Sequence, residues 1–179
     1  MNSVLSTAAA YASPAVSLFS VNSAYTSSTS KIVHLIRHAE GTHNLNEEQS
    51  KLPLHFDAKL TEKGVNQCNE LAKRTKDLNV EAIVVSPLTR TLDTAILSFP
   101  HLYGDGKNKK SSVPFIAHEE WRETVNFLCD ARRPTSVLQQ QYPHVCFNNL
   151  VHDQDDDPIW AHYESIYGDH SAHVSKRES

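Results

Sequence analysis

This chain of 179 residues contains few cysteines and has no net positive charge. The three cysteines, Cys68, Cys129 and Cys146, are an odd number without Cys-x-x-Cys spacing, which argues against a disulfide framework or a zinc site and favours a reducing compartment. The net charge of -4 at pH 7 argues against general affinity for nucleic acid, because such binding requires a basic face. With 39% hydrophobic and 21% charged residues, we expect one soluble domain with a substantial core.

The first 30 residues contain no charged side chain. Residues 1–30 have no Lys or Arg and so lack the basic start of a signal peptide. Polar residues interrupt every apolar run, so no run is long enough for a membrane-spanning helix. The lack of acidic residues would suit a transit peptide to an organelle, but such peptides are rich in arginine and residues 1–30 contain none. We expect a disordered extension, with a targeting segment as the alternative, and a folded domain over residues 31–179. We therefore expect the protein in the cytoplasm, or in an organelle if residues 1–30 are a targeting segment.

The run from Ile32 to Ile36 is apolar and β-branched, with no helix cap before it, and predicts a buried strand. Arg37 and His38 follow directly, and in α/β sheets the chemistry gathers at the carboxyl ends of strands. The arginine fork matches phosphate oxygens, and a neutral imidazole is a competent nucleophile. The two residues form a candidate phosphate site, although a buried structural histidine is the favoured interpretation when the pair is considered alone.

A second apolar run, from Val80 to Val85, leads into another candidate for anion binding. Ser86 can cap a helix and Pro87 suits its first position, so Arg90 is expected in the first helical turn. There its guanidinium and the free backbone N–H groups could face the same anion. A surface arginine on an amphipathic helix is the alternative.

Strands and helices alternate along the rest of the chain. Thr61 is a plausible N-cap, and apolar residues recur at helical spacing from Val65 to Leu78, which predicts a helix between the two strands. A third short strand is expected over Val113 to Ala117, and a short helix over Thr135 to Tyr142. This alternation predicts an α/β fold of three layers, in which helices flank a mostly parallel sheet.

Short motifs follow the predicted strands in order. The first is Arg37-His38-Ala39-Glu40 with Asn44 six positions after the histidine, and the second is Ser-Pro-Leu-x-Arg-Thr-x-x-Thr-Ala around Arg90. The third is Arg122-Glu123, followed by Cys-Asp-x-Arg-Arg at residues 129–133. Together they resemble the histidine phosphatase superfamily, the phosphoglycerate mutase-like proteins, and the last motif resembles a subgroup known from plants and other eukaryotes.

This resemblance implies a phosphoryl transfer in two steps, without a metal or other cofactor. His38 would attack phosphorus and form a phosphohistidine, and the phosphate would be held by Arg37, Arg90 and Asn44. Glu123 would protonate the departing oxygen, with Glu120 as the competing candidate because several acids stand close together. The arginines would supply the positive charge that Mg²⁺ provides in other phosphoryl-transfer enzymes.

A phosphomonoester phosphatase is favoured over a mutase, because water is the default acceptor and no mutase signature is visible. The expected partner is a small phosphorylated substrate, with no nucleic acid or membrane, and the oligomeric state is left open. One alternative is an inactive module that binds phosphate or phosphorylated ligands. The other is a fragment of a phosphoglycerate mutase-type isomerase.

The family pocket also has a second histidine, on a late apolar strand that ends in His-Gly or His-Ser. Nothing similar follows Val145. The resemblance covers about residues 31–165, and we expect a chain truncated before that strand, hence a marginal fold and a poor catalyst. Ala39 and Asn126 stand where the family usually has glycine.

Several other features of the sequence have more than one interpretation. Arg132 and Arg133 could meet substrate at the pocket rim or pair with nearby acids, and loop 45–59 could contribute to specificity. The acids from Asp153 to Asp157, and the pair His170 and His173, lack the companions that calcium or zinc ligands need. A solvated acidic turn is therefore expected, and no metal site.

Overall fold

The computed structural model describes residues 11–13, 16–21, 31–45, 53–104, 112–150 and 155–168, with residues 11–21 given by their backbone alone. Within these residues the strands form two three-stranded sheets. The first is antiparallel and consists of β1 (Tyr11–Ser13), β2 (Val16–Val21) and β3 (Val33–Ile36). The second is parallel and consists of β4 (Ile83–Val85), β5 (Phe115–His118) and β6 (Val145–Asn149).

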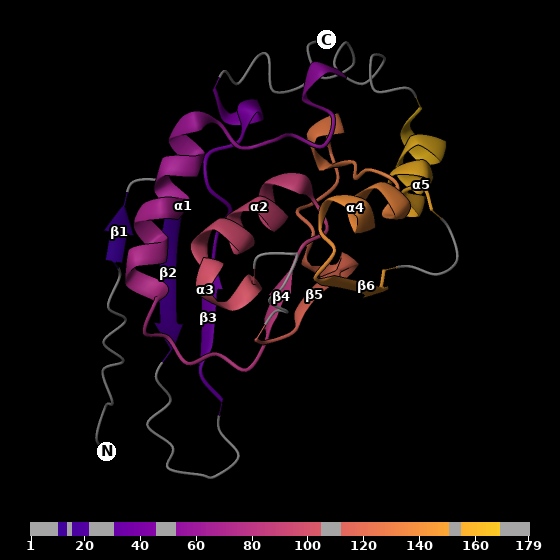
Figure 1. The fold of residues 1–179 in the computed structure, drawn as a ribbon. Helices are drawn as coiled ribbons and strands as arrows, with labels where there is room; N and C mark the ends of the chain where they lie inside the picture. The colour runs from indigo at the N-terminus through magenta and orange to yellow at the C-terminus, as the bar shows by residue number, and fades with distance from the viewer. Residues whose placement is uncertain are drawn as a thin grey trace, which may run out of the picture.

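Helices alternate with these strands and cover them (Figure 1). They are α1 (Glu62–Thr75), α2 (Thr89–Ser98), α3 (Pro100–Tyr103), α4 (Thr135–Gln141) and α5 (Pro158–Tyr167). The parallel βα arrangement confirms the predicted α/β class. The central sheet of β4, β5 and β6 is parallel as predicted, while β3 pairs in the antiparallel sheet and has no ladder to β4 among the described residues.

The main core lies between the second sheet and the helices that pack on it. Leu92 of α2, Phe115 of β5 and Leu138 of α4 are almost completely buried in it. A smaller cluster joins α1 to the first sheet, where Cys68 and Leu71 pack with the partly buried Ile36. These two clusters hold the strand ends that carry the predicted motifs.

β3 differs from its prediction in how far it is buried. The apolar run predicted a buried strand, yet the side chains of Val33 and Leu35 are 54% and 46% exposed. Only Ile36, at the end of the strand, packs against both clusters. An apolar run predicts a strand, but it does not report how many neighbouring elements cover it.

β1 and β2 fall within residues 1–30, where the sequence predicted a disordered extension or a targeting segment. The backbone of β2 pairs with β3 from Leu18↔Ile36 to Val21↔Val33. The other residues of that segment lie outside the described residues, as do Asp153, His170 and His173. The prediction for residues 1–30 as a whole therefore stays a prediction.

Candidate active site

His38 lies just beyond the carboxyl end of β3, in a fixed orientation. Its Nδ1 is 2.7 Å from the carbonyl oxygen of Ala39. Because a carbonyl oxygen only accepts hydrogen bonds, Nδ1 is the protonated nitrogen in this contact, and Nε2 keeps its lone pair. The backbone N–H of Ala39 donates to Thr94 Oγ1 at 3.0 Å, and Ala39 is completely buried. The residue after the histidine must therefore be small, which alanine satisfies as glycine would.

Several charges act on the imidazole of His38. Burial lowers the pKa of His38, and the charges of Arg90 and Arg37 lower it further, whereas the bond to Ala39 and the charge of Glu123 oppose this shift. The structure thus brings together His38 and three residues that the motifs singled out. At pH 7 the imidazole is neutral, the form that can attack phosphorus.

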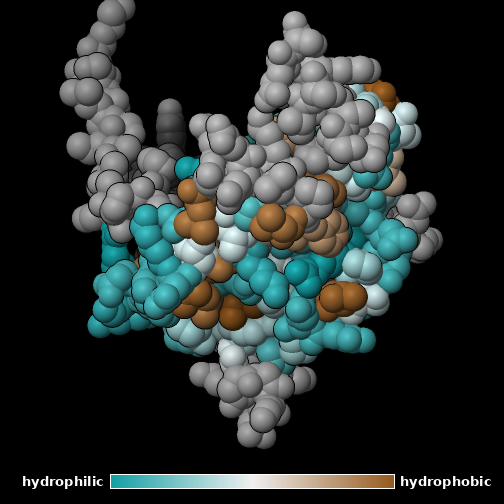
Figure 2. All heavy atoms as spheres, turned by 90° about the horizontal axis from the view of Figure 1, so that it is seen from above, coloured by the Kyte–Doolittle hydropathy of each residue, from teal (hydrophilic) through white to brown (hydrophobic). Residues whose placement is uncertain are grey.

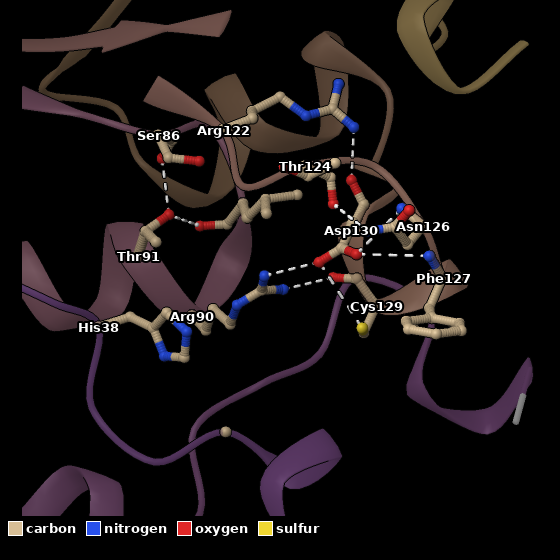
Figure 3. A network of polar contacts seen from close by, with 12 residues as sticks. His38, Ser86, Arg90, Thr91, Arg122, Thr124, Asn126, Phe127, Cys129 and Asp130 are labelled. Atoms are coloured by element: carbon tan, nitrogen blue, oxygen red, sulfur yellow. Dashed lines mark hydrogen bonds and ion pairs between the residues drawn. The ribbon is translucent and has the colours of Figure 1, made fainter. Parts of the chain in front are cut away.

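Arg90 is buried next to His38, with its guanidinium directed toward the segment 129–130 (Figure 3). Its Nη2 donates to Asp130 Oδ1 at 2.9 Å, and its Nη1 donates to the carbonyl oxygen of Cys129. Its Nε is buried and has no hydrogen-bond partner within the described residues. An unpaired buried donor is costly, which sets this nitrogen apart from the paired nitrogens of the same guanidinium.

The N-terminus of α2, which carries Arg90, is capped from a distant part of the chain. Leu88 is the N-cap, and the predicted capping role of Ser86 is wrong. Instead, Asp57 accepts hydrogen bonds from the backbone N–H of Thr89 at 2.8 Å and from Thr89 Oγ1 at 2.6 Å. Asp57 is fully buried and has a φ of 45°, a left-handed conformation that aspartate tolerates better than most residues.

The segment after β3 is fixed against the start of α1. Thr61 caps α1 as predicted, accepting from the N–H of Gly64 at 3.0 Å. The N–H of Thr61 in turn donates to the carbonyl oxygen of Glu40 at 2.9 Å. A Cβ at position 64 would meet that carbonyl oxygen at 2.2 Å, so only glycine allows this close approach. The Leu-Thr-x-x-Gly opening therefore helps to hold the His38 motif in place.

Three neighbouring glutamates have different surroundings. Glu119 is 4% exposed and pairs with Arg132 Nε at 2.7 Å. The side chain of Glu120 is 87% exposed and lies 4.0 Å from His118 Nδ1. Only Glu123 is among the charges that act on His38. These surroundings favour Glu123 over Glu120 as the acid of the site.

The arginines that follow β5 form ion pairs with acidic side chains of the same chain. The side chain of Arg132 is completely buried and pairs with Glu119, while Arg133 Nε donates to Asp57 Oδ2 at 3.0 Å. Arg122 pairs with both oxygens of Asp157, each at 2.8 Å. Of the two interpretations of Arg132 and Arg133, pairing with nearby acids is the one observed.

The other two predicted phosphate-binding residues are exposed. Arg37 reaches His38 electrostatically but is open to solvent. Asn44 closes the 3₁₀ turn η1 (Thr42–Asn44), where its Oδ1 accepts from the N–H of Gly41 at 2.9 Å. Their predicted contact with phosphate stays a prediction.

His43 is a residue of the site that the sequence interpretation missed. Its ring centroid is 5.5 Å from that of His38, and a Cβ at Gly41 would meet its Nδ1 at 2.6 Å, so glycine leaves the room it occupies. Burial, followed by the charges of Arg90 and His38, lowers the pKa of His43 to about 3. No local pattern could have found it, since its sequence neighbours are ordinary polar residues.

These lowered pKa values predict how stability depends on pH. Below about pH 6.5 the unfolded chain binds protons that folded His38 and His43 do not, so the free energy of unfolding should fall as the pH drops from about 7 to 4. Each histidine contributes at most about 1.4 kcal/mol per pH unit. Urea unfolding of His43→Gln should show a shallower pH dependence, while the exposed His162→Gln should match the unchanged chain. An equal slope in His43→Gln would contradict this prediction.

Metal-binding clusters and membrane-spanning helices are both absent from the described residues. These residues contain no group of three or more His, Cys, Asp or Glu side chains arranged to hold a metal ion. In the same ranges, no helix has the length and apolar character needed to cross a membrane.

Comparison with known proteins agrees with the motif order. The family model described as "Histidine phosphatase superfamily (branch 1)" matches residues 33–174, most of the chain. The chain belongs to the histidine phosphatase superfamily. The match begins at β3 and includes every motif described above.

Individual relatives carry two kinds of name. A phosphoglycerate mutase-like protein of Arabidopsis thaliana is 30% identical over 158 residues, which cover 73% of this chain and 58% of the relative. A "probable phosphatase" of Schizosaccharomyces pombe is 24% identical over 139 residues, covering 76% of this chain and 59% of the relative. A 2,3-bisphosphoglycerate-dependent phosphoglycerate mutase of Chlamydia abortus is 24% identical, covering 60% and 48%. The chain thus spans about half the length of these curated relatives.

Proposed function

We propose that this superfamily member is a phosphomonoester phosphatase that acts through a phosphohistidine on His38. The observation that carries the proposal is that the bond at Nδ1 leaves Nε2 of His38 available, while the positive charges of Arg90 and Arg37 act on the same imidazole. A phosphoryl group bound at His38 would be stabilised by these charges while Nε2 attacks phosphorus.

The reaction has two displacements. In the first, the lone pair of His38 Nε2 forms the N–P bond, the P–O bond to the leaving group breaks, and Glu123 gives its proton to the departing oxygen. In the second, water attacks phosphorus, the N–P bond breaks, and the proton of the water passes to Glu123. Arg90 and Arg37 stabilise the charge on the phosphoryl oxygens in both steps, so the protein contributes mainly position and electrostatics.

Apolar side chains beside the site favour an ester with an apolar organic part. His55 Nδ1 lies 3.3 Å from Thr42 Oγ1, which places the 3₁₀ turn η3 (Pro53–His55) against η1. Leu45, Leu54 and Phe56, on or next to these turns, are 66%, 71% and 41% exposed. Figure 2, which views the molecule from the top of Figure 1, shows separate hydrophobic patches among hydrophilic side chains.

The experiment that tests the function compares two reactions of the same chain. Release of inorganic phosphate from an aryl phosphate, faster than from a sugar phosphate of equal charge, supports the phosphatase proposal. Transfer of the phosphoryl group between hydroxyls of a phosphoglycerate without release would favour the mutase. The last described strand, β6, carries no histidine, an observation that favours the inactive binding module; phosphate binding without either reaction would identify that function.

Arg90→Lys should lower kcat/KM by about tenfold or more, equivalent to about 1.4 kcal/mol of transition-state stabilisation. Lysine is a point charge on a flexible stem and cannot both bind the segment 129–130 and present a fixed donor to phosphate. The exposed Arg74→Lys on α1 is the matched control and should leave kinetics unchanged. Steady-state hydrolysis of an aryl phosphate measures both. Equal kcat/KM in the two variants would make Arg90 a structural residue only.

A further inference from the structure

The guanidinium of Arg90 is held by a single turn, η5 (Leu128–Asp130), that lies far along the chain. The ion pair between Arg90 and Asp130 is deeply buried, with the two side chains 2% and 7% exposed. We propose that Asp130 is a positioning residue that aims Arg90 at the phosphate bound beside His38. This inference rests on the proposed function, because it assigns the purpose of the pair to that phosphate.

The two carboxylate oxygens of Asp130 have separate partners (Figure 3). Oδ2 accepts from the backbone N–H groups of Phe127 and Asn126, at 3.3 and 3.4 Å, within its own turn. Oδ1 accepts from Arg90 at 2.9 Å. Because the first oxygen is tied to the backbone, the carboxylate cannot rotate freely, and the direction of Oδ1 determines where the guanidinium lies.

The turn that carries Asp130 is itself anchored. Arg122 Nη2 donates to the carbonyl oxygen of Asp130, and the side chain of Arg122 is 3% exposed. Arg122 is held by the two oxygens of Asp157, and Asp157 also caps α5, accepting from the N–H of Trp160 at 3.0 Å. A continuous set of contacts therefore runs from the N-terminus of α5 to Arg90, and Asp130 is the member that touches Arg90.

This arrangement fixes a side chain that would otherwise sample many rotamers. Ordering an arginine costs side-chain entropy, and a guanidinium that is ordered in advance spares the transition state that cost. Each Nη group donates one hydrogen bond to η5, and the charge of Arg90 acts on His38, so η5 sets where this guanidinium lies relative to His38. A small displacement of the guanidinium would lower the rate, since misplacement by about 1 Å can cost a hundredfold.

Position and charge have opposite consequences for anion binding. Asp130 is negative, so if only its charge mattered, removing it would strengthen the binding of inorganic phosphate. If it positions Arg90, removing it weakens binding despite the gained positive charge. Two substitutions separate these effects: Asp130→Asn removes the charge at constant size, and Asp130→Glu keeps the charge but displaces it by one methylene.

The experiment measures inorganic phosphate affinity by calorimetry, together with kcat/KM, for both variants. We expect the phosphate Kd to rise about tenfold in each, and kcat/KM to fall roughly tenfold to a hundredfold. Asp155→Asn is the control: that carboxylate is exposed and binds Ser136 at 2.7 Å on α4, without touching Arg90. In an Arg90→Lys background, Asp130→Asn should add little, because the residue it positions is already gone.

Unchanged or tighter phosphate binding in the two Asp130 variants would overturn the inference, as would losses that simply add to that of Arg90→Lys. Should Asp130→Asn fail to fold, Asp130→Glu still carries the test, since it keeps the buried charge paired. Failure of the proposed function has a different signature, the absence of a phosphoenzyme in the unchanged chain. Phosphate affinity requires no turnover, so the two failures are distinguishable.

Discussion

His38→Ala should form no phosphoenzyme and should hydrolyse an aryl phosphate at least about a thousandfold more slowly than the unchanged chain. The imidazole is the group whose Nε2 is free to form the N–P bond, since its Nδ1 is committed to Ala39. Rapid quench with a labelled phosphate ester should trap an acid-labile, base-stable adduct on the unchanged chain. This trapping needs only the first displacement, so it does not depend on fast turnover.

Two histidine variants serve as controls for that result. His162→Ala changes an exposed histidine on α5 and should leave the adduct intact. His43→Gln changes the neighbouring ring, 5.5 Å away, and should still form the adduct because Nε2 of His38 remains in place. An adduct that persisted in His38→Ala but disappeared in His43→Gln would transfer the nucleophile to His43.

The second large effect concerns stability and the buried pair of Arg122 with Asp157. Asp157→Asn should lower the free energy of unfolding by about 3–5 kcal/mol, because it removes one of the two buried carboxylates that pair with Arg122 and leaves Glu119 to balance both Arg122 and Arg132. Against a total stability of about 5–15 kcal/mol for a domain, such a loss could leave much of the chain unfolded. Asparagine keeps an oxygen that can cap α5, but its amide nitrogen cannot accept the hydrogen bonds that Asp157 Oδ2 takes from Arg122 and from the backbone N–H of Arg132, so these contacts are lost together with the charge.

Urea unfolding of Asp157→Asn beside Asp156→Asn measures this effect. Asp156 is exposed, and only its backbone oxygen contacts Arg132, so its substitution should cost less than about 0.5 kcal/mol. Burial alone would raise the pKa of Asp157, but the hydrogen bonds and charge of Arg122 hold it below its ordinary value. The pair therefore stabilises the fold above the ordinary aspartate pKa, and this stability is lost as the pH falls through the lowered value. Equal unfolding of the two variants would show that the pair contributes nothing.

Local patterns predicted the elements well where the cause was local. Thr61 caps α1 because the cap and its partner are three residues apart. The alternation of apolar runs and helical spacing was enough to predict β3, β4, α1 and α4, and their order predicted the α/β class. The motif residues His38 and Arg90 were found because each follows a strand that could be recognised by composition.

Predictions failed where the partner came from elsewhere in the chain. Ser86 was expected to cap α2, but Asp57 does so, and no local pattern indicates a contact with Thr89, which lies 32 positions further along the chain. β3 was expected to be buried, but burial depends on how many elements cover it. Arg132 and Arg133 had two possible roles, which their pairing with Glu119 and Asp57 decided.

The sequence by itself determined the family, the order of strands and helices, and the residue types at the candidate site. Spacing along one chain segment is sufficient for that, because caps, periodicity and motifs are local. Only the tertiary structure decided that Glu119 is buried, that His43 stands beside His38, and that Asp130 holds Arg90. These contacts and the burial of Glu119 depend on how separate parts of the chain pack together. Burial and the charges that surround a residue are properties of the packed chain, and no single segment determines them.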